Sequence, residues 1–239
     1  MGFLPIRPVF ILNGPHALRA ALARMPATCS LALAFFLVFI AQRILSGVEF
    51  RVGFPFDEPV LFAFGLHPAL LFSEGFFWQP LTHVFLHGSW PHLLCNALGL
   101  ALLGRMLEPW LESGRFLILF FAGGITGGLV WAAHNGLWHL HAGAPLGLCV
   151  GASGGVFGLL GACSAFYANR ALRILVLFIP LRMKGKWLAA LVFLFTAADA
   201  ALGLTRFAHA AHLAGFAAGW LLARRWRSEY VFEGEPDAV

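Results

Sequence analysis

The sequence predicts an all-α integral membrane protein, built as a bundle of six transmembrane helices. Of its 239 residues, 60% are hydrophobic and only 11% are charged, whereas soluble domains are about 25% charged. In addition, the chain contains six apolar segments, each close to the length that crosses a hydrocarbon core of about 30 Å. Because a bilayer cannot hydrogen-bond the backbone, each of these segments is predicted to be a helix.

The apolar segments divide the chain into a central membrane domain and two flanks. A basic cytoplasmic N-terminal segment is expected over 1–28, the membrane domain over 29–224 and a short cytoplasmic tail over 225–239. The run ILVLFIPL (174–181) is too short to span and is interrupted by Pro180, so we expect it at the membrane interface. The aromatic connection 47–89 is expected in the outer leaflet. The six predicted spans are 29–46, 90–107, 115–134, 153–169, 186–202 and 207–224.

The charged residues predict the orientation of these spans. Only Arg43, Arg51 and Arg206 of the 16 Lys and Arg residues fall on one side of the predicted bundle, and the remaining 13 fall on the other. The positive-inside rule therefore places both termini in the cytoplasm. Since the basic residues occur in short groups between apolar runs, the net charge of +5 indicates membrane topology and not a nucleic-acid partner. An acid-free, Arg-containing 1–28 is also compatible with a mitochondrial presequence.

The four cysteines predict neither a disulfide framework nor a metal site. They form no CxxC pair, and cysteines in apolar segments usually pack as small hydrophobic residues. His83 and His87 have the i, i+4 spacing of a zinc site, but the glutamate of an HExxH motif is absent, because Val84 follows His83. No cofactor is implied.

Polar residues inside apolar segments are costly and usually mark function. His92 and Asn96 are four residues apart, so they share a face of the second predicted helix. Ser153 lies in GASGGVFG at the start of the fourth helix, and His212 lies in HAAHLAGFAAG in the sixth. These three places are the candidates for chemistry.

Glycine spacing predicts that Ser153 and His212 lie close together. Gly154 and Gly158 form a GxxxG pair on the fourth helix, and a second pair, Gly215 and Gly219, shares the face of His212. Small residues of this kind allow transmembrane helices to approach closely. A neutral imidazole within hydrogen-bond reach of a serine can take its proton during nucleophilic attack. His92, Asn96 and the serine backbone N–H would then stabilise the oxyanion.

Together these residues resemble the rhomboid family of intramembrane serine proteases. The resemblance runs from H-x3-H-x4-H-x3-N (83–96), through G-x-S-G (151–154), to H-x2-G-x3-G (212–219), in the order of the family and over most of the chain. It implies a six-transmembrane-helix rhomboid-like bundle whose domain 29–224 is a membrane protease. It also implies a Ser–His dyad without an acid, and transmembrane protein substrates cleaved near small residues in the lipid bilayer.

Carried over to this sequence, the resemblance assigns a role to each residue. Ser153 is the nucleophile and His212 the general base, with His92 and Asn96 as oxyanion donors. Gly151 shapes the loop before the serine, His83 lies at the polar mouth of the cavity, and Glu108 is structural. Six spans and a short cytoplasmic N-terminus indicate the inner membrane of a bacterium.

Two positions depart from the family pattern. Many relatives have Trp-Arg in the first loop, where this chain has Trp78 and Gln79, which leaves the anchoring of that loop open. Phe157 replaces a tyrosine that stacks on the catalytic histidine in bacterial relatives; phenylalanine can stack but has no hydroxyl.

Other functions compete with this reading. GASGG also fits the G-x-S-x-G nucleophile elbow of α/β-hydrolases, with Asp199 and His212 in the order of that triad, but the elbow requires strands alternating with helices. His209 competes with His212 as the base but lacks the aligned glycines. A catalytically silent, membrane-protein-binding pseudoprotease or a transporter is a non-enzymatic alternative, although we find no inverted repeat.

Overall fold

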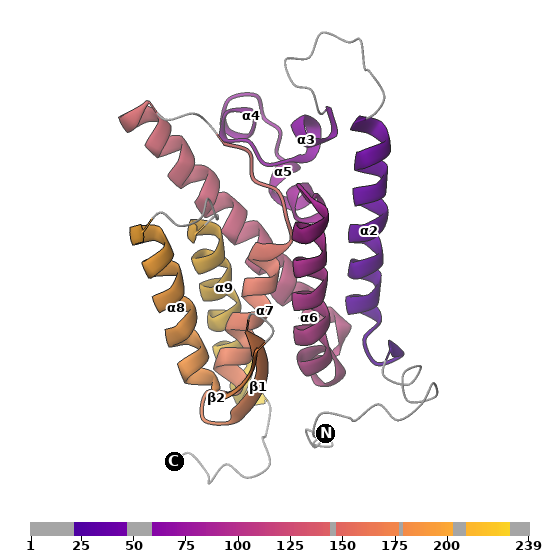
Figure 1. The fold of residues 1–239 in the computed structure, drawn as a ribbon, viewed down its shortest axis with the longest axis vertical. Coiled ribbons are helices and arrows are strands. Elements are labelled where there is room, and N and C mark those ends of the chain that lie inside the picture. The colour runs from indigo at the N-terminus through magenta and orange to yellow at the C-terminus, as the bar shows by residue number, and fades with distance from the viewer. Residues whose placement is uncertain (1–21, 47–58, 144–146, 177–178, 203–208, 230–239) are drawn as a thin grey trace.

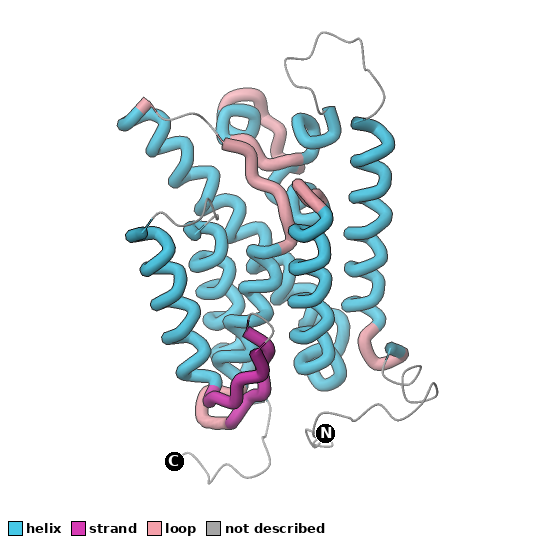
Figure 2. The backbone as a smooth tube through the Cα atoms, viewed as in Figure 1, coloured by secondary structure: helices cyan, strands magenta, loops and turns pink. Residues whose placement is uncertain are grey.

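The computed structural model describes residues 22–46, 59–143, 147–176, 179–202 and 209–229. Long helices stand side by side, short helices and loops cover one end of the bundle, and a hairpin lies at the other end (Figures 1 and 2). In chain order the elements are α2 (Pro26–Ser46), α3 (Pro59–Phe64), α4 (Pro68–Phe72), α5 (Gln79–Thr82), η1 (His83–Phe85), α6 (Trp90–Ala142), α7 (Ser153–Phe166), β1 (Ala171–Val176), β2 (Ile179–Lys184), α8 (Gly185–Leu202), α9 (His209–Trp226) and η2 (Arg227–Glu229).

Helices lie where the six apolar segments were predicted, and the protein is an all-α membrane protein. The second and third segments are both contained in α6, which reverses direction at Glu112, where φ is 63° and ψ is 160°. Two of the described helices, Pro26–Leu45 and Trp90–Ala142, are long and apolar enough to cross a membrane. At 14 residues α7 is shorter.

Two helix ends differ from the sequence prediction. The second leg of α6 continues to Ala142 and ends at Gly143, which has a φ of 62°. Its last turns therefore hold His139 and His141, which lie beyond the end of the predicted span 115–134. At the C-terminus, α9 runs to Trp226 and η2 follows it, so the helix extends past residue 224, the predicted end of the sixth span.

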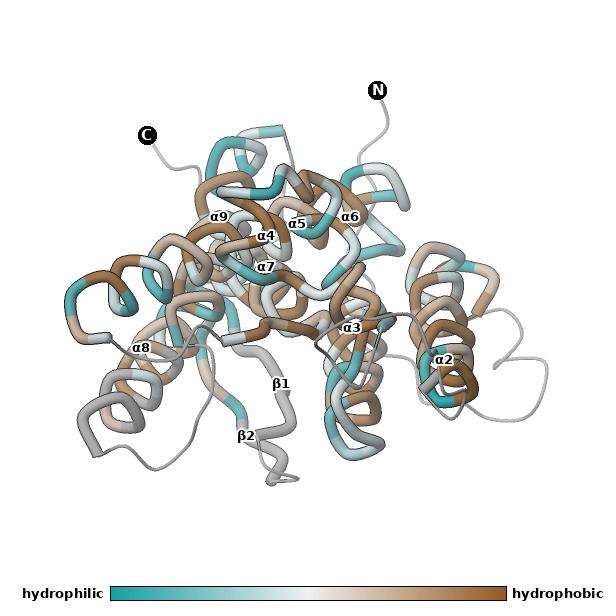
Figure 3. The backbone as a smooth tube through the Cα atoms, turned by 90° about the horizontal axis from the view of Figure 1, so that it is seen from above, coloured by the Kyte–Doolittle hydropathy of each residue, from teal (hydrophilic) through white to brown (hydrophobic). Residues whose placement is uncertain are grey.

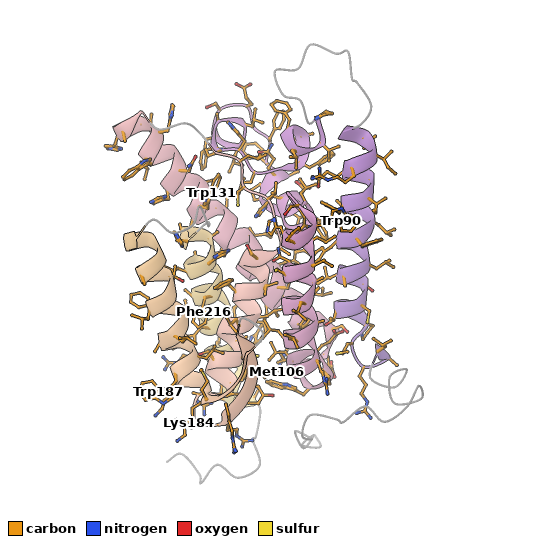
Figure 4. The ribbon with its side chains drawn as sticks, viewed as in Figure 1. Trp90, Met106, Trp131, Lys184, Trp187 and Phe216 are labelled. Atoms are coloured by element: carbon orange, nitrogen blue, oxygen red, sulfur yellow. The ribbon has the colours of Figure 1, made fainter. Side chains whose placement is uncertain are left out.

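A β-hairpin occupies the segment that was expected only to lie at the interface. Strands β1 and β2 pair antiparallel, with Arg173 opposite Arg182 and Val176 opposite Ile179. Pro180 was expected to interrupt this run. A proline is tolerated in an edge strand, and both strands of a two-stranded hairpin are edges. Lys184, at the end of β2, lies at the same end of the bundle as Met106 and Trp187 (Figure 4).

The first turn of α2 is fixed by a carboxylate of α6. Glu108 is buried and accepts hydrogen bonds from the backbone N–H groups of Ala27, at 2.7 Å, and Thr28, at 2.8 Å. It also accepts from the hydroxyls of Thr28, at 2.6 Å, and Ser113, at 2.8 Å. The first N–H groups of a helix have no partner within that helix and favour negative charge. Glu108 therefore connects the reversal of α6 to the start of α2.

Close glycine packing joins α7 to α9 and to the second leg of α6, and α7 lies near the centre when the bundle is viewed from above (Figure 3). A Cβ atom on Gly219 would overlap the carbonyl of Gly158, and one on Gly215 would overlap the carbonyl of Gly154. The two predicted GxxxG pairs therefore face each other. A Cβ on Gly123 of α6 would lie 2.8 Å from Cα of Gly158. The three backbones can reach these positions only without side chains.

Candidate active site

Ser153 is the first residue of α7 and is half-buried. Gly151, two residues earlier, has a φ of 123°, which residues with side chains rarely adopt. Its N–H donates to the carbonyl of His83 at 2.9 Å, while Cys149 pairs with Leu66 through two backbone hydrogen bonds of 2.9 Å each. These bonds hold the segment before the serine against the first connection, and α7 begins below the upper ends of α2 and α6 (Figure 1).

The structure brings His212 of α9 to Ser153. The imidazole Nε2 lies 2.9 Å from Ser153 Oγ, a hydrogen-bond distance. The Phe157 ring stacks on the imidazole, with centroids 4.3 Å apart and planes 3° apart. Phe157 lies four residues after Ser153, one helical turn along α7, so the same helix supplies both the hydroxyl and a flat surface for the imidazole. His209 begins α9, one turn before His212.

His92 and Asn96 approach the segment before the serine from the first turns of α6. A Cβ on Gly151 would lie 2.7 Å from His92 Nε2 and 3.8 Å from Asn96 Nδ2. Gly151 therefore leaves the space that the imidazole occupies. Asn96 is buried, and its Nδ2 donates to the carbonyl of His92 at 2.9 Å. Ser89 caps the helix, since its Oγ accepts from the N–H of His92 at 3.3 Å.

The tautomer of the neutral His92 ring follows from a hydrogen bond with Gly88. The N–H of Gly88 donates to Nδ1 of His92 at 3.4 Å. Because Nδ1 accepts, the neutral ring carries its proton on Nε2, the nitrogen that lies against Gly151. The ring is therefore oriented to donate a hydrogen bond beside Ser153.

His83 is buried, 3% exposed, and does not lie at an open mouth. Its Nδ1 donates to the carbonyl of Gln79 at 3.0 Å, and its ring fills the space left by Gly128, where a Cβ would lie 2.6 Å from the ring. Burial lowers the pKa of His83 to about 4. His83 supports the site through its carbonyl, which accepts from Gly151.

A comparison with known families gives this arrangement its context. The rhomboid domain matches residues 74–228, more than half of the chain, and this range includes Ser153, His212, His92 and Asn96. This chain belongs to the rhomboid family. It is 34% identical over 132 residues to the rhomboid protease GluP of Bacillus subtilis, which is 54% of this chain and 24% of GluP. It is also 34% identical over 89 residues to YdcA of the same organism, whose name also refers to rhomboid proteases; the match covers 37% of this chain and 41% of YdcA. The match thus covers less than half the length of each relative.

In this rhomboid chain the first connection is anchored by Gln79, at the position where the family often has arginine. The Gln79 side chain is fully buried, accepts from the N–H of His67 at 3.1 Å and donates to the carbonyl of Phe62 at 3.1 Å. Trp78 and Thr82 add bonds to the carbonyls of Ala63 and Phe64, each at 2.7 Å. A neutral amide can thus anchor this loop without a charge.

Sequence reasoning missed two groups of residues around this rhomboid site. Gly123 and Gly127 of α6 complete the close packing; a Cβ on Gly127 would lie 2.6 Å from the carbonyl oxygen of Ala211. Their GxxxG spacing was the available signal. The other is the single residue Gln42, a glutamine within the mostly apolar helix α2, whose polarity was the same kind of signal as that of Asn96.

Proposed function

We propose that this protein is an intramembrane serine endopeptidase that cleaves peptide bonds in or near the transmembrane segments of other membrane proteins. The observation that carries the proposal is the 2.9 Å contact between Ser153 Oγ and His212 Nε2. A serine is activated as a nucleophile when a neighbouring base lies within this reach. The named proteases among its relatives are consistent with this chemistry.

The chemical steps follow from the two side chains. Ser153 Oγ attacks the carbonyl carbon of the substrate peptide bond while its proton passes to His212 Nε2. When the tetrahedral intermediate collapses, the C–N bond breaks and His212 returns the proton to the leaving amine, giving an acyl-enzyme. A water molecule, deprotonated by His212, then attacks the ester carbonyl and releases the new carboxyl terminus and Ser153. Stacking on the Phe157 ring fixes the plane of the imidazole, so that its Nε2 stays directed to the Ser153 hydroxyl.

Three donors are positioned to stabilise the oxyanion of the tetrahedral intermediate. Nε2–H of His92 lies against Gly151, and Asn96 Nδ2 lies beside it. The third is the backbone N–H of Ser153, which belongs to the first turn of α7 and has no partner within the helix. One such donor typically contributes about 3–4 kcal/mol to the stability of the transition state.

The depth of Ser153 favours a substrate within the membrane. A helix of 14 residues is about 21 Å long at 1.5 Å per residue, shorter than a hydrocarbon core of about 30 Å. Ser153 begins α7, and the other end of this helix lies at the basic end of the bundle. With that end at the cytoplasmic surface, a helix of this length does not reach the outer surface, so Ser153 lies below it. By the positive-inside rule, the basic residues of α9 and of the hairpin side, Arg224 and Lys184 among them, favour a cytoplasmic position for both termini, and the bacterial relatives favour a plasma membrane.

The proposal is tested by cleavage of a transmembrane reporter protein in proteoliposomes, together with labelling by a fluorophosphonate probe. The parent protein is expected to cleave the reporter and to label at Ser153. Ser153→Ala is expected to lose both activities, and His212→Ala is expected to lose at least about 1,000-fold in cleavage. A parent protein that binds the reporter but neither cuts nor labels would instead be a pseudoprotease or a transporter.

A further inference from the structure

Gln42 is a buried amide on α2, outside the residues that match the rhomboid domain. Its two polar atoms both bind the backbone of one residue of the loop before α6. Nε2 donates to the carbonyl of His87 at 3.0 Å, and Oε1 accepts from the N–H of the same residue at 3.3 Å. A side-chain amide that pairs with both groups of one residue fixes the orientation of the backbone there.

The carbonyl that Gln42 holds belongs to the same peptide unit as the N–H that orients His92. In a trans peptide the C=O of His87 and the N–H of Gly88 point in opposite directions within one plane. Gln42 holds the oxygen, and the N–H on the opposite side donates to Nδ1 of His92 at 3.4 Å. Rotation of this peptide plane would break both hydrogen bonds, so the amide of Gln42 and the imidazole are coupled through one rigid group.

The side chain of His87 packs against its neighbours without a hydrogen bond in the described part of the chain, so the hydrogen-bonded connection to His92 runs through the main chain. The ring of His87 lies between Phe35, with centroids 5.3 Å apart, and His92, with centroids 5.2 Å apart. Neither ring nitrogen of His87 has a hydrogen-bond partner among the described residues. The next carbonyl, that of Gly88, accepts from Arg43 Nη2 at 3.1 Å. Two consecutive residues of α2 therefore hold two consecutive carbonyls of the loop.

Packing keeps α2 in place for this role. Trp90, in the first turn of α6, contacts Phe39 with ring centroids 4.9 Å apart and Phe36 with centroids 6.0 Å apart. In Figure 4 the Trp90 side chain lies on the side of α6 that faces α2. The aromatic contact sets the distance between the helices, and the hydrogen bonds of Gln42 set the orientation of the peptide.

We infer that Gln42 is a positioning residue for the oxyanion site: its amide fixes the peptide between residues 87 and 88, which keeps Nδ1 of His92 as an acceptor and Nε2–H directed to the oxyanion. This inference rests on the proposed protease function. Loss of the two hydrogen bonds of Gln42 frees the peptide between residues 87 and 88 to rotate, and His92 can then adopt the other tautomer. Since the tetrahedral intermediate needs the donor more than the bound substrate does, kcat falls while KM is kept.

The test compares kcat and KM of the full-length protein in proteoliposomes for the parent and for Gln42→Met and Gln42→Glu. Methionine keeps the volume and removes both bonds, whereas a buried glutamic acid is neutral and keeps an acceptor and an O–H donor. Gln42→Met is expected to lose about tenfold in kcat with KM unchanged, less than the roughly 100-fold expected for His92→Ala, and Gln42→Glu is expected to keep more of the parental kcat than Gln42→Met. A parental kcat in Gln42→Met would overturn the inference, because the two bonds would then be unnecessary.

Two controls separate positioning from a general loss of stability. Thr28→Val removes a hydrogen bond at the other end of α2, so it should lower the melting temperature and leave kcat within about twofold of the parent. In the His92→Ala background, Gln42→Met should have almost no further effect on the rate of fluorophosphonate labelling, because residues that act as a unit are not additive. Provided that the parent protein cleaves and labels, either of two results would overturn the inference. One is a full tenfold effect of Gln42→Met in the His92→Ala background, and the other is a tenfold loss of kcat in Thr28→Val. A parent without either activity would contradict the proposed function itself.

Discussion

The two sides of α6 are joined to their neighbours by different means. Its second leg meets α7 and α9 through glycines, where backbone lies on backbone and no space for a side chain remains. Its first leg meets α2 through aromatic rings and through polar contacts at both ends, Glu108 at one and the loop held by Gln42 at the other. The glycine side fixes the distance between Ser153 and His212. The α2 side fixes the orientation of groups that assist them.

This contrast implies different sensitivities to mutation. A backbone contact cannot yield by rotating a side chain, so a single added methyl group must move a helix. A polar contact can lose one hydrogen bond while the helices remain in place. We therefore expect changes on the glycine side to remove activity and stability together, and changes on the α2 side to affect them separately.

The largest effect is expected from Gly219→Ala. The new Cβ would overlap the carbonyl of Gly158, so α9 must move away from α7 and carry His212 from Ser153. We expect a loss of about 3 kcal/mol in stability and at least about 100-fold in reporter cleavage, measured by thermal melting and by initial rates. Gly114→Ala is the matched control, because a Cβ there meets nothing within 4 Å. A fully active Gly219→Ala variant would show that the close packing does not set the catalytic distance.

Acid is expected to destabilise the connection before α6, which contains the buried residues His83 and His87. Burial lowers the pKa of His83 to about 4, and burial, with the nearby His92, lowers that of His87 to about 4. Between the unfolded value of about 6.5 and about 4, the unfolded chain binds more protons than the folded chain, so stability is complete above pH 6.5 and falls as the pH drops to 4. We expect His83 to contribute on the order of 3 kcal/mol to this fall. In His83→Gln, melting temperatures should fall less between pH 7 and pH 4 than in the parent; an unchanged slope would contradict the assignment.

Glu108→Gln tests the anchored end of α2. The amide NH2 replaces an oxygen that accepts from one backbone N–H and one hydroxyl. The hydroxyl can turn to accept, but the backbone N–H loses its acceptor, which should cost about 1–3 kcal/mol of stability. Because Ser153 and His212 are held by glycine packing, kcat measured well below the melting temperature should stay within about twofold of the parent. A proportionate loss of kcat and stability would show that the two sides of α6 are not independent.

The smallest effect is expected at Phe157. Phe157→Leu removes the ring that stacks on His212, a contact worth about 1 kcal/mol, so kcat should fall about fivefold. Phe157→Tyr keeps the ring and should retain the parental rate. If leucine is as active as phenylalanine, the glycine packing alone orients the imidazole.

Most of the helices and the pairing of Ser153 with His212 could be predicted from local patterns. Apolar segments and the requirement to satisfy the backbone placed the helices, and GxxxG spacing predicted that α7 and α9 would lie face to face. The second leg of α6 was predicted to end at residue 134, whereas the helix continues through Asn135 and Gly136 to its left-handed cap at Gly143, because a helix-ending residue type does not end a helix whose neighbours support it. The β-hairpin was missed because its pairing is set between strands and not within either strand.

The sequence by itself determined the class of the protein, the family to which it belongs and the residues that could react, because composition, helical periodicity and motif spacing are local properties of the chain. Only the tertiary structure decided that His83 is buried and that Gln79 anchors the first connection. It also decided that Gln42, 50 residues before His92, is joined to that imidazole through a single peptide group. Such relations depend on which helices become neighbours and on how each is rotated, and no local pattern encodes them.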